Sequence, residues 1–142
     1  MTIYSDSSFI ASYYLEDAHS AEVDRRMAQR PRVWLTSFNR TEVEHAISHM
    51  VFRRRISLAE AQLARNDFAQ DCAQGIWIAV GLPESIWEAS IKLARQFAPT
   101  LGVRTLDSLH VACALELKAE RFWTFDERQG RLAETVGLDT CP

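Results

Sequence analysis

The chain has few of the residues that build disulfide frameworks or zinc sites. It contains three cysteines, Cys72, Cys113 and Cys141, which are far apart and form neither a Cys-x-x-Cys pair nor a metal-type Cys/His spacing. Two of them fall in apolar patterns of helical period, so we expect them to have packing roles. This use of cysteine indicates a reducing compartment and a core that needs no disulfide staples.

Long apolar runs are also missing. Residues 1–6 enter a strand pattern at once, without a basic region, and no stretch is apolar for long enough to serve in export or to cross a membrane. We therefore expect a cytoplasmic protein with no membrane partner. The sequence shows no repeats, low-complexity segments or linkers, and its length fits one domain over residues 1–142.

Lysine is scarce, whereas arginine is abundant. Lys92 and Lys118 are the only lysines among 16 basic residues. Arginine suits phosphate binding because its planar guanidinium donates two parallel hydrogen bonds, although a GC-rich genome would give the same bias. The formal net charge of −3 disfavours a general polyanion binder, unless bound cations neutralise some of the acids.

Strand and helix patterns alternate along the chain. Strands are predicted at residues 3–4, 33–36, 76–80 and 122–125, with a small last strand at 138–141. Helices are predicted at residues 7–15, 19–28, 39–52, 57–73, 83–97, from 105 onward, and from 126 to before 137. Parallel neighbours need long crossovers, so the pattern predicts an α/β fold with a central parallel sheet of about four to five strands and helices on both faces.

Cap and turn residues mark several boundaries within this pattern. Residues 57–60 match a capping box, Pro83 suits the first turn of the following helix, and Pro99 with Gly102 is expected to form a loop. Residues 39–73 are predicted to form a helical hairpin. The arginines at 53–55 near its tip are either a solvated helix end or a contact with an RNA backbone.

Acidic residues lie where strand patterns give way to helical ones. The four are Asp6, Glu42, Asp107 and Asp126. Strand-to-helix junctions of a parallel sheet all fall at its carboxyl edge, so we expect these acids to be neighbours. Oxygen ligands without a Cys or His cluster favour Mg²⁺ or Mn²⁺ over zinc. Such ions activate water and stabilise charge on an attacked phosphate, which suits hydrolysis of a phosphodiester.

Each acid also has a structural interpretation as part of a helix start. Asp6 and Asp126 are suitable N-caps, and residues 39–42 have capping-box form. Asp107 follows Thr105, which we expect to supply the cap, so that the carboxylate projects from the first turn. Four carboxylates at one edge would repel one another without a cation, and this favours a metal site.

The motifs around the acids resemble those of PIN-domain nucleases. SDSSFI at residues 5–10 looks like the family's opening motif, and SFNRTEVEHAI at 37–47 is similar to its second. RTLDSLHVA at 104–112 and WTFD at 123–126 resemble the third and fourth. Order and spacing are similar to those of the VapC-like toxins of type II toxin–antitoxin systems, over essentially the whole chain.

The resemblance implies a single PIN-like domain and a Mg²⁺- or Mn²⁺-dependent endoribonuclease that acts as a toxin. Its implied partners are an RNA substrate, a small cognate antitoxin and a second copy in a homodimer. Carried over by position, catalysis and metal binding fall to Asp6, Glu42, Asp107 and Asp126. Ser8 and Thr124 are implied as hydrogen-bonding neighbours.

Some residues near the motifs need a separate interpretation. Gln129 and Gly130 stand where the family often has an apolar residue, so Glu127 either assists or replaces Asp126. Glu44 lies on a different helix face from Glu42, which we prefer as the ligand. His110 lies on the apolar face of its helix and is expected to be a packed core residue. The same holds for three tryptophans in strand patterns, Trp34, Trp77 and Trp123.

Three other functions are compatible with acids at a sheet edge. An aspartate-based phosphatase usually has a second Asp two positions after the first, where Ser8 stands. A phosphoacceptor signalling domain needs a lysine at the end of a late strand, and both lysines lie in helical patterns. A non-catalytic PIN-fold binding module would not need the four acids that this chain retains.

Overall fold

Four parallel strands form the centre of the protein. The computed structural model describes residues 1–140 and places the strands in the order β3-β2-β1-β4. Their bounds are β1 Thr2–Ser5, β2 Arg32–Leu35, β3 Trp77–Ala79 and β4 Arg121–Trp123. The helices are α1 Ser7–Tyr14, α2 Ser20–Met27, α3 Ser37–Phe52, α4 Leu58–Ala73, α5 Ile86–Leu101, α6 Thr105–Glu116 and α7 Glu127–Thr135.

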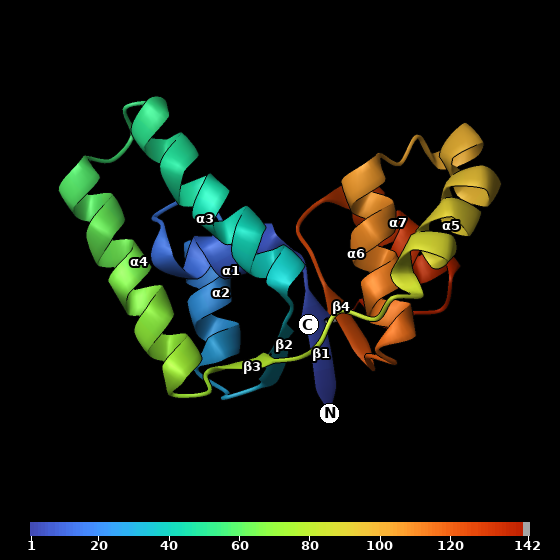
Figure 1. Cartoon of the computed structure of the whole chain (residues 1–142), viewed down its shortest axis with the longest axis horizontal. Helices are drawn as coiled ribbons and strands as arrows, with labels where there is room; N and C mark the ends of the chain where they lie inside the picture. Colours follow the sequence, from blue (N-terminus) through green and yellow to red (C-terminus); the bar gives the residue numbers. More distant parts are fainter. Residues whose placement is uncertain (141–142) are drawn as a thin grey trace.

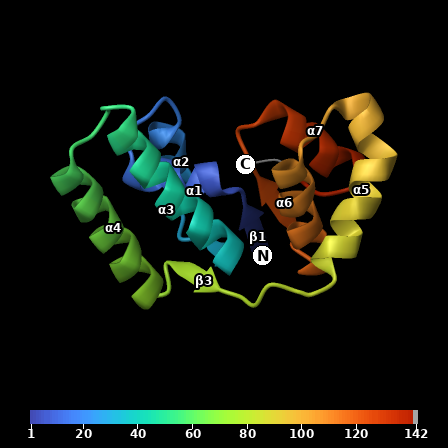
Figure 2. The same cartoon turned by 45° about the horizontal axis from the view of Figure 1, so that its top comes forward.

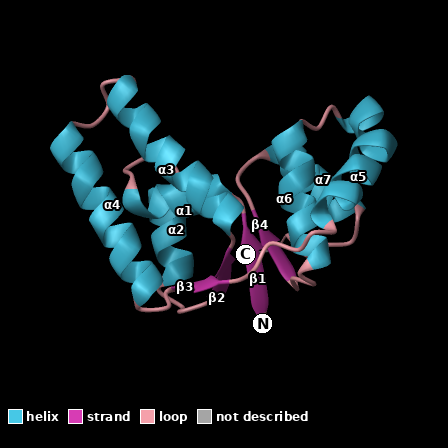
Figure 3. Cartoon of the chain, viewed as in Figure 1, coloured by secondary structure: helices cyan, strands magenta, loops and turns pink. Residues whose placement is uncertain are grey.

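Helices cover both faces of the sheet, as Figures 1 and 3 show. Successive side chains of a strand point to opposite faces. Ile3 accordingly packs in a core with α1 to α4, whereas Tyr4 packs in a second core with α5 to α7. In Figure 2 the segment between β3 and α5 crosses from one layer to the other. The predicted parallel α/β fold with helices on both faces is confirmed.

The strand register aligns the carboxyl ends of β1 and β4. Ser5, the last residue of β1, pairs with Trp123, the last residue of β4. The pairing continues beyond the strands, because the Asp6 amide donates to the Trp123 carbonyl at 3.0 Å. Residues that follow these two strands therefore start side by side at one edge of the sheet.

Helix α3 begins two residues earlier than the sequence pattern predicts. Thr36 is its N-cap. The Thr36 hydroxyl accepts the Asn39 backbone amide at 3.2 Å, and the Asn39 side-chain oxygen Oδ1 accepts the Thr36 backbone amide at 3.0 Å. The predicted capping box at residues 39–42 is therefore wrong. Because the helix starts at Ser37, Glu42 lies in its second turn and has no capping role. The box predicted at 57–60 is confirmed at the start of α4.

Both proline predictions for α5 were wrong. Pro83 precedes the helix and accepts the Ile86 amide in a turn, at 3.2 Å. Pro99 lies inside the last turn rather than in a loop. A proline so close to a helix end forgoes a single hydrogen bond, and Leu101 beyond it still packs against the second core. The helix ends at Gly102, whose φ of 66° suits a glycine cap.

The last predicted strand is reduced to one bridge within the described chain. Asp139 pairs in parallel with Arg121, and the Phe122 amide donates to the Asp139 carbonyl at 2.8 Å. Cys141 lies outside the described residues. Cys72 and Cys113 are free thiols packed in helices, as predicted. Over residues 1–140, no helix is long and apolar enough to cross a membrane.

Candidate metal centre at the carboxyl edge of the sheet

Asp6 ends β1 and caps α1, so it is held from several sides. Its Oδ1 accepts the Phe9 amide at 2.9 Å and the Ser8 hydroxyl at 2.8 Å, and its Oδ2 accepts the Thr124 hydroxyl at 2.7 Å. Asp6 is only 4% exposed. Burial raises its pKa, although the His110 charge and the hydrogen bonds lower it in part. The predicted N-cap and the implied roles of Ser8 and Thr124 as neighbours are confirmed.

Glu42 reaches the same edge from the second turn of α3. Its Oε1 accepts the Ser7 hydroxyl at 2.7 Å and contacts His110 Nε2 at 2.6 Å. Burial alone would raise the pKa of Glu42, but the hydrogen bond and charge of His110 and the Ser7 hydroxyl together lower it. Among the described residues both contacts end on Oε1, so Oε2 remains available. Glu44 points away and pairs with Arg65 on α4, at 3.1 Å.

His110 is the residue whose role the sequence missed. It is buried, as predicted, and its ring stacks on Phe38 with centroids 4.5 Å apart. It also bridges Tyr4, at 2.8 Å from Nδ1, to Glu42. A signal was present in the spacing, because His110 lies three residues after Asp107 and therefore near the same helix face.

Asp107 lies in the first turn of α6 and has a structural contact of its own. Its Oδ2 accepts the Arg104 amide at 2.8 Å, and its Oδ1 accepts the Gln129 side-chain amide at 3.3 Å. The prediction that Thr105 supplies the cap is wrong. Thr105 is already the first helical residue, and the Asp107 carboxylate itself satisfies the amide of the N-cap residue Arg104.

Asp126 caps α7, as predicted, and is the most exposed of the four acids. Its Oδ1 accepts the Gln129 amide at 2.8 Å, while its own amide donates to the Thr124 hydroxyl at 3.0 Å. Gln129 was noted in the sequence only as a departure from the family pattern. The structure buries it and joins it to both Asp107 and Asp126. Glu127 is exposed and lies 4.0 Å from Arg131, so its assisting role stays a prediction.

The four acids are joined through intermediaries rather than by direct contact. Thr124 links Asp6 to Asp126, and Gln129 links Asp126 to Asp107. Glu42 joins through Ser7, the neighbour of Asp6 in the chain. Across residues 1–140, no three His, Cys, Asp or Glu side chains gather tightly enough to hold an ion in this arrangement. The metal-ligand assignment therefore stays a prediction.

The donor set nevertheless fits a hard cation. All four acids offer oxygen, the ligand atom that Mg²⁺ and Mn²⁺ prefer. Asp6 and Glu42 also show opposite pKa shifts, the kind of difference that marks functional carboxylates. The residues that would hold the ion are Asp6, Glu42 through Oε2, Asp107 and Asp126.

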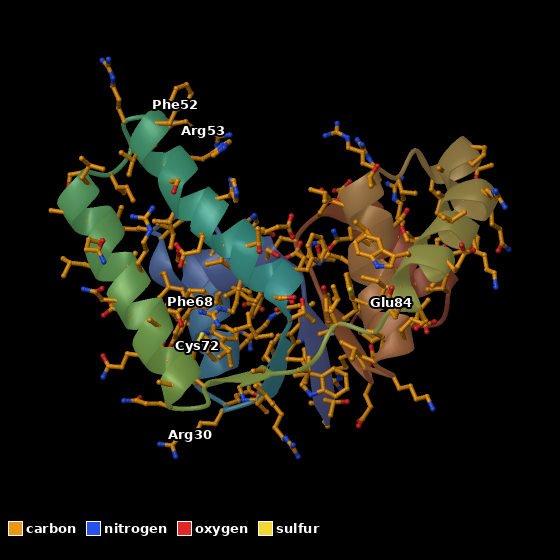
Figure 4. All side chains as sticks on the ribbon, viewed as in Figure 1. Arg30, Phe52, Arg53, Phe68, Cys72 and Glu84 are labelled. Atoms are coloured by element: carbon orange, nitrogen blue, oxygen red, sulfur yellow. The ribbon has the colours of Figure 1, made fainter. Side chains whose placement is uncertain are left out.

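A hollow of about 320 Å³ runs along α3 from Glu42 toward the tip of the helical hairpin. Its lining residues are Leu15, Glu42, His45, Ala46, His49, Met50 and Arg53. Figure 4 places Arg53 near the tip, next to Phe52. Of the three exposed arginines at 53–55, Arg53 thus shares a hollow with a candidate ligand. The two interpretations of this arginine, a contact with an RNA backbone and a solvated helix end, both stay predictions.

The tryptophans in the strands belong to the cores rather than to a nucleic-acid platform. Trp77 and Trp123 are buried, and Trp34 packs partly buried against the second core. The Trp77 ring meets Tyr13 edge-on, with centroids 5.7 Å apart. Their predicted packing role is confirmed.

Comparison with solved structures supports the same fold. FitAcB from Neisseria gonorrhoeae has a TM-score of 0.72 at 13% identity, with 99% of this chain and 96% of that one covered. VapC20 of Mycobacterium tuberculosis, a toxin that cleaves the sarcin–ricin loop, has a TM-score of 0.70 at 16% identity, with 98% of each chain covered. VapBC2 from Rickettsia felis, bound to a promoter DNA fragment, has a TM-score of 0.67 at 11% identity over all of both chains.

No curated protein matches the chain by sequence. At the identities of the solved structures, likeness shows the fold alone. A family model gives the stronger result, because the model of the PIN domain matches residues 3–135, nearly the whole length. The four motifs, the parallel sheet and the acids at its carboxyl edge agree with that match, and the chain belongs to the PIN domain family.

Proposed function

We propose that this protein is a Mg²⁺- or Mn²⁺-dependent endoribonuclease, and that it acts in the cytoplasm as the toxin of a toxin–antitoxin pair. One observation carries the proposal. Asp6, Glu42, Asp107 and Asp126 reach one edge of the sheet in a chain of the PIN family, tied together by Ser7, Thr124 and Gln129. The toxin VapC20, which shares the fold, cleaves the sarcin–ricin loop.

The described side chains would have separate roles in such a site. Thr124 and Ser8 fix the Asp6 carboxylate, and Ser7 with His110 fixes Glu42. A bound divalent ion would supply an activated water and would stabilise charge on the attacked phosphate. Arg53, in the hollow beside Glu42, would bind a neighbouring phosphate and orient the RNA strand.

Cleavage of RNA by the purified protein tests the proposal. We expect fragments to appear with MnCl₂ or MgCl₂, to disappear with EDTA, and to be absent for Asp6→Asn and Asp107→Asn. Glu44→Gln is the matched control, because Glu44 is an acid of the same helix as Glu42 that pairs with Arg65 outside the site. Cleavage that persists in EDTA and in both Asn variants would reject the metal-dependent site.

The non-catalytic alternative predicts a different result in the same samples. A binding module of the same fold would take up neither ion and would leave every RNA intact. Calorimetric titration with MnCl₂ therefore separates the two functions before any RNA target is known. Sequencing of the fragments made on induction would then identify that target.

The proposal includes a homodimer and a small antitoxin. The α3–α4 hairpin exposes apolar side chains that would be covered in a homodimer, namely Phe52, Leu58 and Leu63.

The antitoxin would place an Arg or Lys against Asp6, Glu42 and Asp107, and this positive charge would compete electrostatically with the metal ion. Light scattering should report a dimer. A small gene should lie next to the one for this chain, and co-expression with it should relieve growth arrest. A strict monomer, or arrest despite co-expression, would count against these partners.

A further inference from the structure

A buried line of polar side chains runs from the sheet to Glu42. The Tyr4 hydroxyl lies 2.8 Å from His110 Nδ1, and His110 Nε2 lies 2.6 Å from Glu42 Oε1. Tyr4 and His110 are buried, whereas the Glu42 side chain is 24% exposed. The line thus begins in the second core and ends at the edge where the acids gather.

The direction of both hydrogen bonds follows from the chemistry of the buried groups. The phenolic hydroxyl of Tyr4 is protonated at neutral pH and has one proton to donate. When the imidazole is neutral, His110 Nδ1 accepts the hydrogen bond of that hydroxyl, and the one ring proton then lies on Nε2. A carboxylate oxygen only accepts, so Nε2 carries a proton in the protonated ring as well. Nε2 in turn donates to Glu42 Oε1. Both ring nitrogens are satisfied in this arrangement.

Packing keeps the imidazole in this orientation. One face stacks on Phe38, at 4.5 Å and an interplanar angle of 29°. Tyr4 itself stacks on Phe122, at 5.7 Å and 8°. A ring enclosed in this way cannot rotate to offer its other nitrogen to Glu42 without disturbing the second core.

We infer that His110, oriented by Tyr4, is a positioning residue that holds Glu42 by Oε1 and thereby leaves Oε2 as the oxygen that would bind a metal ion. The inference rests on the proposed metal-dependent function. Ser7 donates to the same Oε1, so two hydrogen bonds fix the carboxylate from one side. Partners of this kind orient a ligand and set its affinity without touching the metal.

Two substitutions of His110 separate its two hydrogen bonds. In His110→Gln the side-chain amide reaches the position of Nε2 and still donates to Glu42, but the acceptor for Tyr4 is lost. In His110→Asn the shorter amide reaches the position of Nδ1 and keeps the Tyr4 contact, but the donor to Glu42 is lost. We expect His110→Asn to weaken Mn²⁺ binding by about 10- to 100-fold, and His110→Gln to recover most of that loss.

Tyr4→Phe covers the case in which the His110 variants fail to fold. It removes one oxygen and keeps the ring that stacks on Phe122. We expect it to lower Mn²⁺ affinity by up to about tenfold, because His110 loses the group that fixes its ring proton. Glu44→Gln is the control for charge on α3 and should bind Mn²⁺ as the wild type does.

An NMR measurement on the metal-free protein gives a readout that does not depend on activity. We expect a slowly exchanging proton on His110 Nε2 in the wild type, because that atom is buried and hydrogen-bonded. The exposed His19, His45 and His49 should show no such proton. The signal should broaden or vanish in Tyr4→Phe. A ring proton found on Nδ1 instead would overturn the inference.

The titrations distinguish a failed inference from a failed function. If Glu42→Gln binds Mn²⁺ as tightly as the wild type, Glu42 is not a ligand and the proposed site is wrong. If Glu42→Gln loses affinity while His110→Asn and Tyr4→Phe keep it, the site stands and the positioning role of His110 is refuted.

Discussion

Replacing Asp6 by Asn and by Ala should separate its role in the fold from its proposed role at the metal. Asn keeps an oxygen that accepts the Phe9 amide, and Asn caps helices about as well as Asp. Its amide would face Thr124, whose hydroxyl has a second lone pair to accept it. Asn also removes a buried charge whose ionisation is disfavoured by burial.

The expected magnitudes follow from these contacts. Asp6→Ala loses the cap, at about 1 kcal/mol, and leaves the Thr124 hydroxyl without its acceptor, at about 1–3 kcal/mol. For 142 residues the entropy of unfolding is about 0.3 kcal/mol/K, so the Tm of metal-free Asp6→Ala should fall by about 7–13 °C. Asp6→Asn should stay within about 3 °C of the wild type.

Thermal unfolding with and without Mn²⁺ is the assay. At 100 times its Kd, the ion should stabilise the wild type by about 2.7 kcal/mol, or about 9 °C, and should leave both variants unchanged. If Asp6→Asn is as unstable as Asp6→Ala, the negative charge itself maintains the fold. If both variants gain as much from Mn²⁺ as the wild type, Asp6 is not a ligand.

Three further predictions test other parts of the molecule. Burial raises the pKa of Asp6 above its ordinary value of about 3.8. As the pH rises from that value through the folded-state pKa, the metal-free wild type should therefore lose stability relative to Asp6→Asn. A difference in Tm that stays flat across this pH range would contradict the prediction. Arg53→Gln should reduce the salt dependence of RNA binding by about one unit of slope. Arg30→Asn should not, because Arg30 lies at the bottom of Figure 4 whereas Arg53 lies at the top. Equal slopes would make Arg53 an ordinary helix-end residue. Tyr14→Phe should lower the Tm by about 3–10 °C, because the buried Trp77 indole N–H loses its acceptor. Tyr13→Phe is the control and should change stability by less than about 0.5 kcal/mol. Equal losses in the two variants would assign the effect to ring packing.

The sequence predicts the parts of this site that depend on topology and local caps. Asp6 and Asp126 follow buried strands, and a parallel sheet brings such positions together whatever the details of packing. Both also cap helices, as short-range patterns indicate. What escaped prediction depends on tertiary contacts. His110 has the appearance of any buried helical residue, and only the meeting of α6 with α3 shows that it bonds Glu42.

The wrong boundaries have the same origin. Thr36 ends a strand pattern, and its use as a cap becomes visible only when Asn39 is seen buried beneath the first turn of α3. Pro99 normally marks a break, but the packing of Leu101 against the second core extends α5 past it. At Pro99 a tertiary contact outweighs a local preference, and at Asn39 the side-chain hydrogen bond to the Ser5 carbonyl adds a tertiary contact to the local cap.

The two cores on opposite faces of the sheet have a consequence for how cooperatively the molecule opens. Asp6 and Glu42 belong to elements of one layer, whereas Asp107 and Asp126 belong to helices of the other. Segments that pack on separate faces are able to unfold locally as separate units, which amide hydrogen exchange detects. An ion held by acids from both layers would act as a non-covalent cross-link, and α3 and α6 would then open together rather than one at a time.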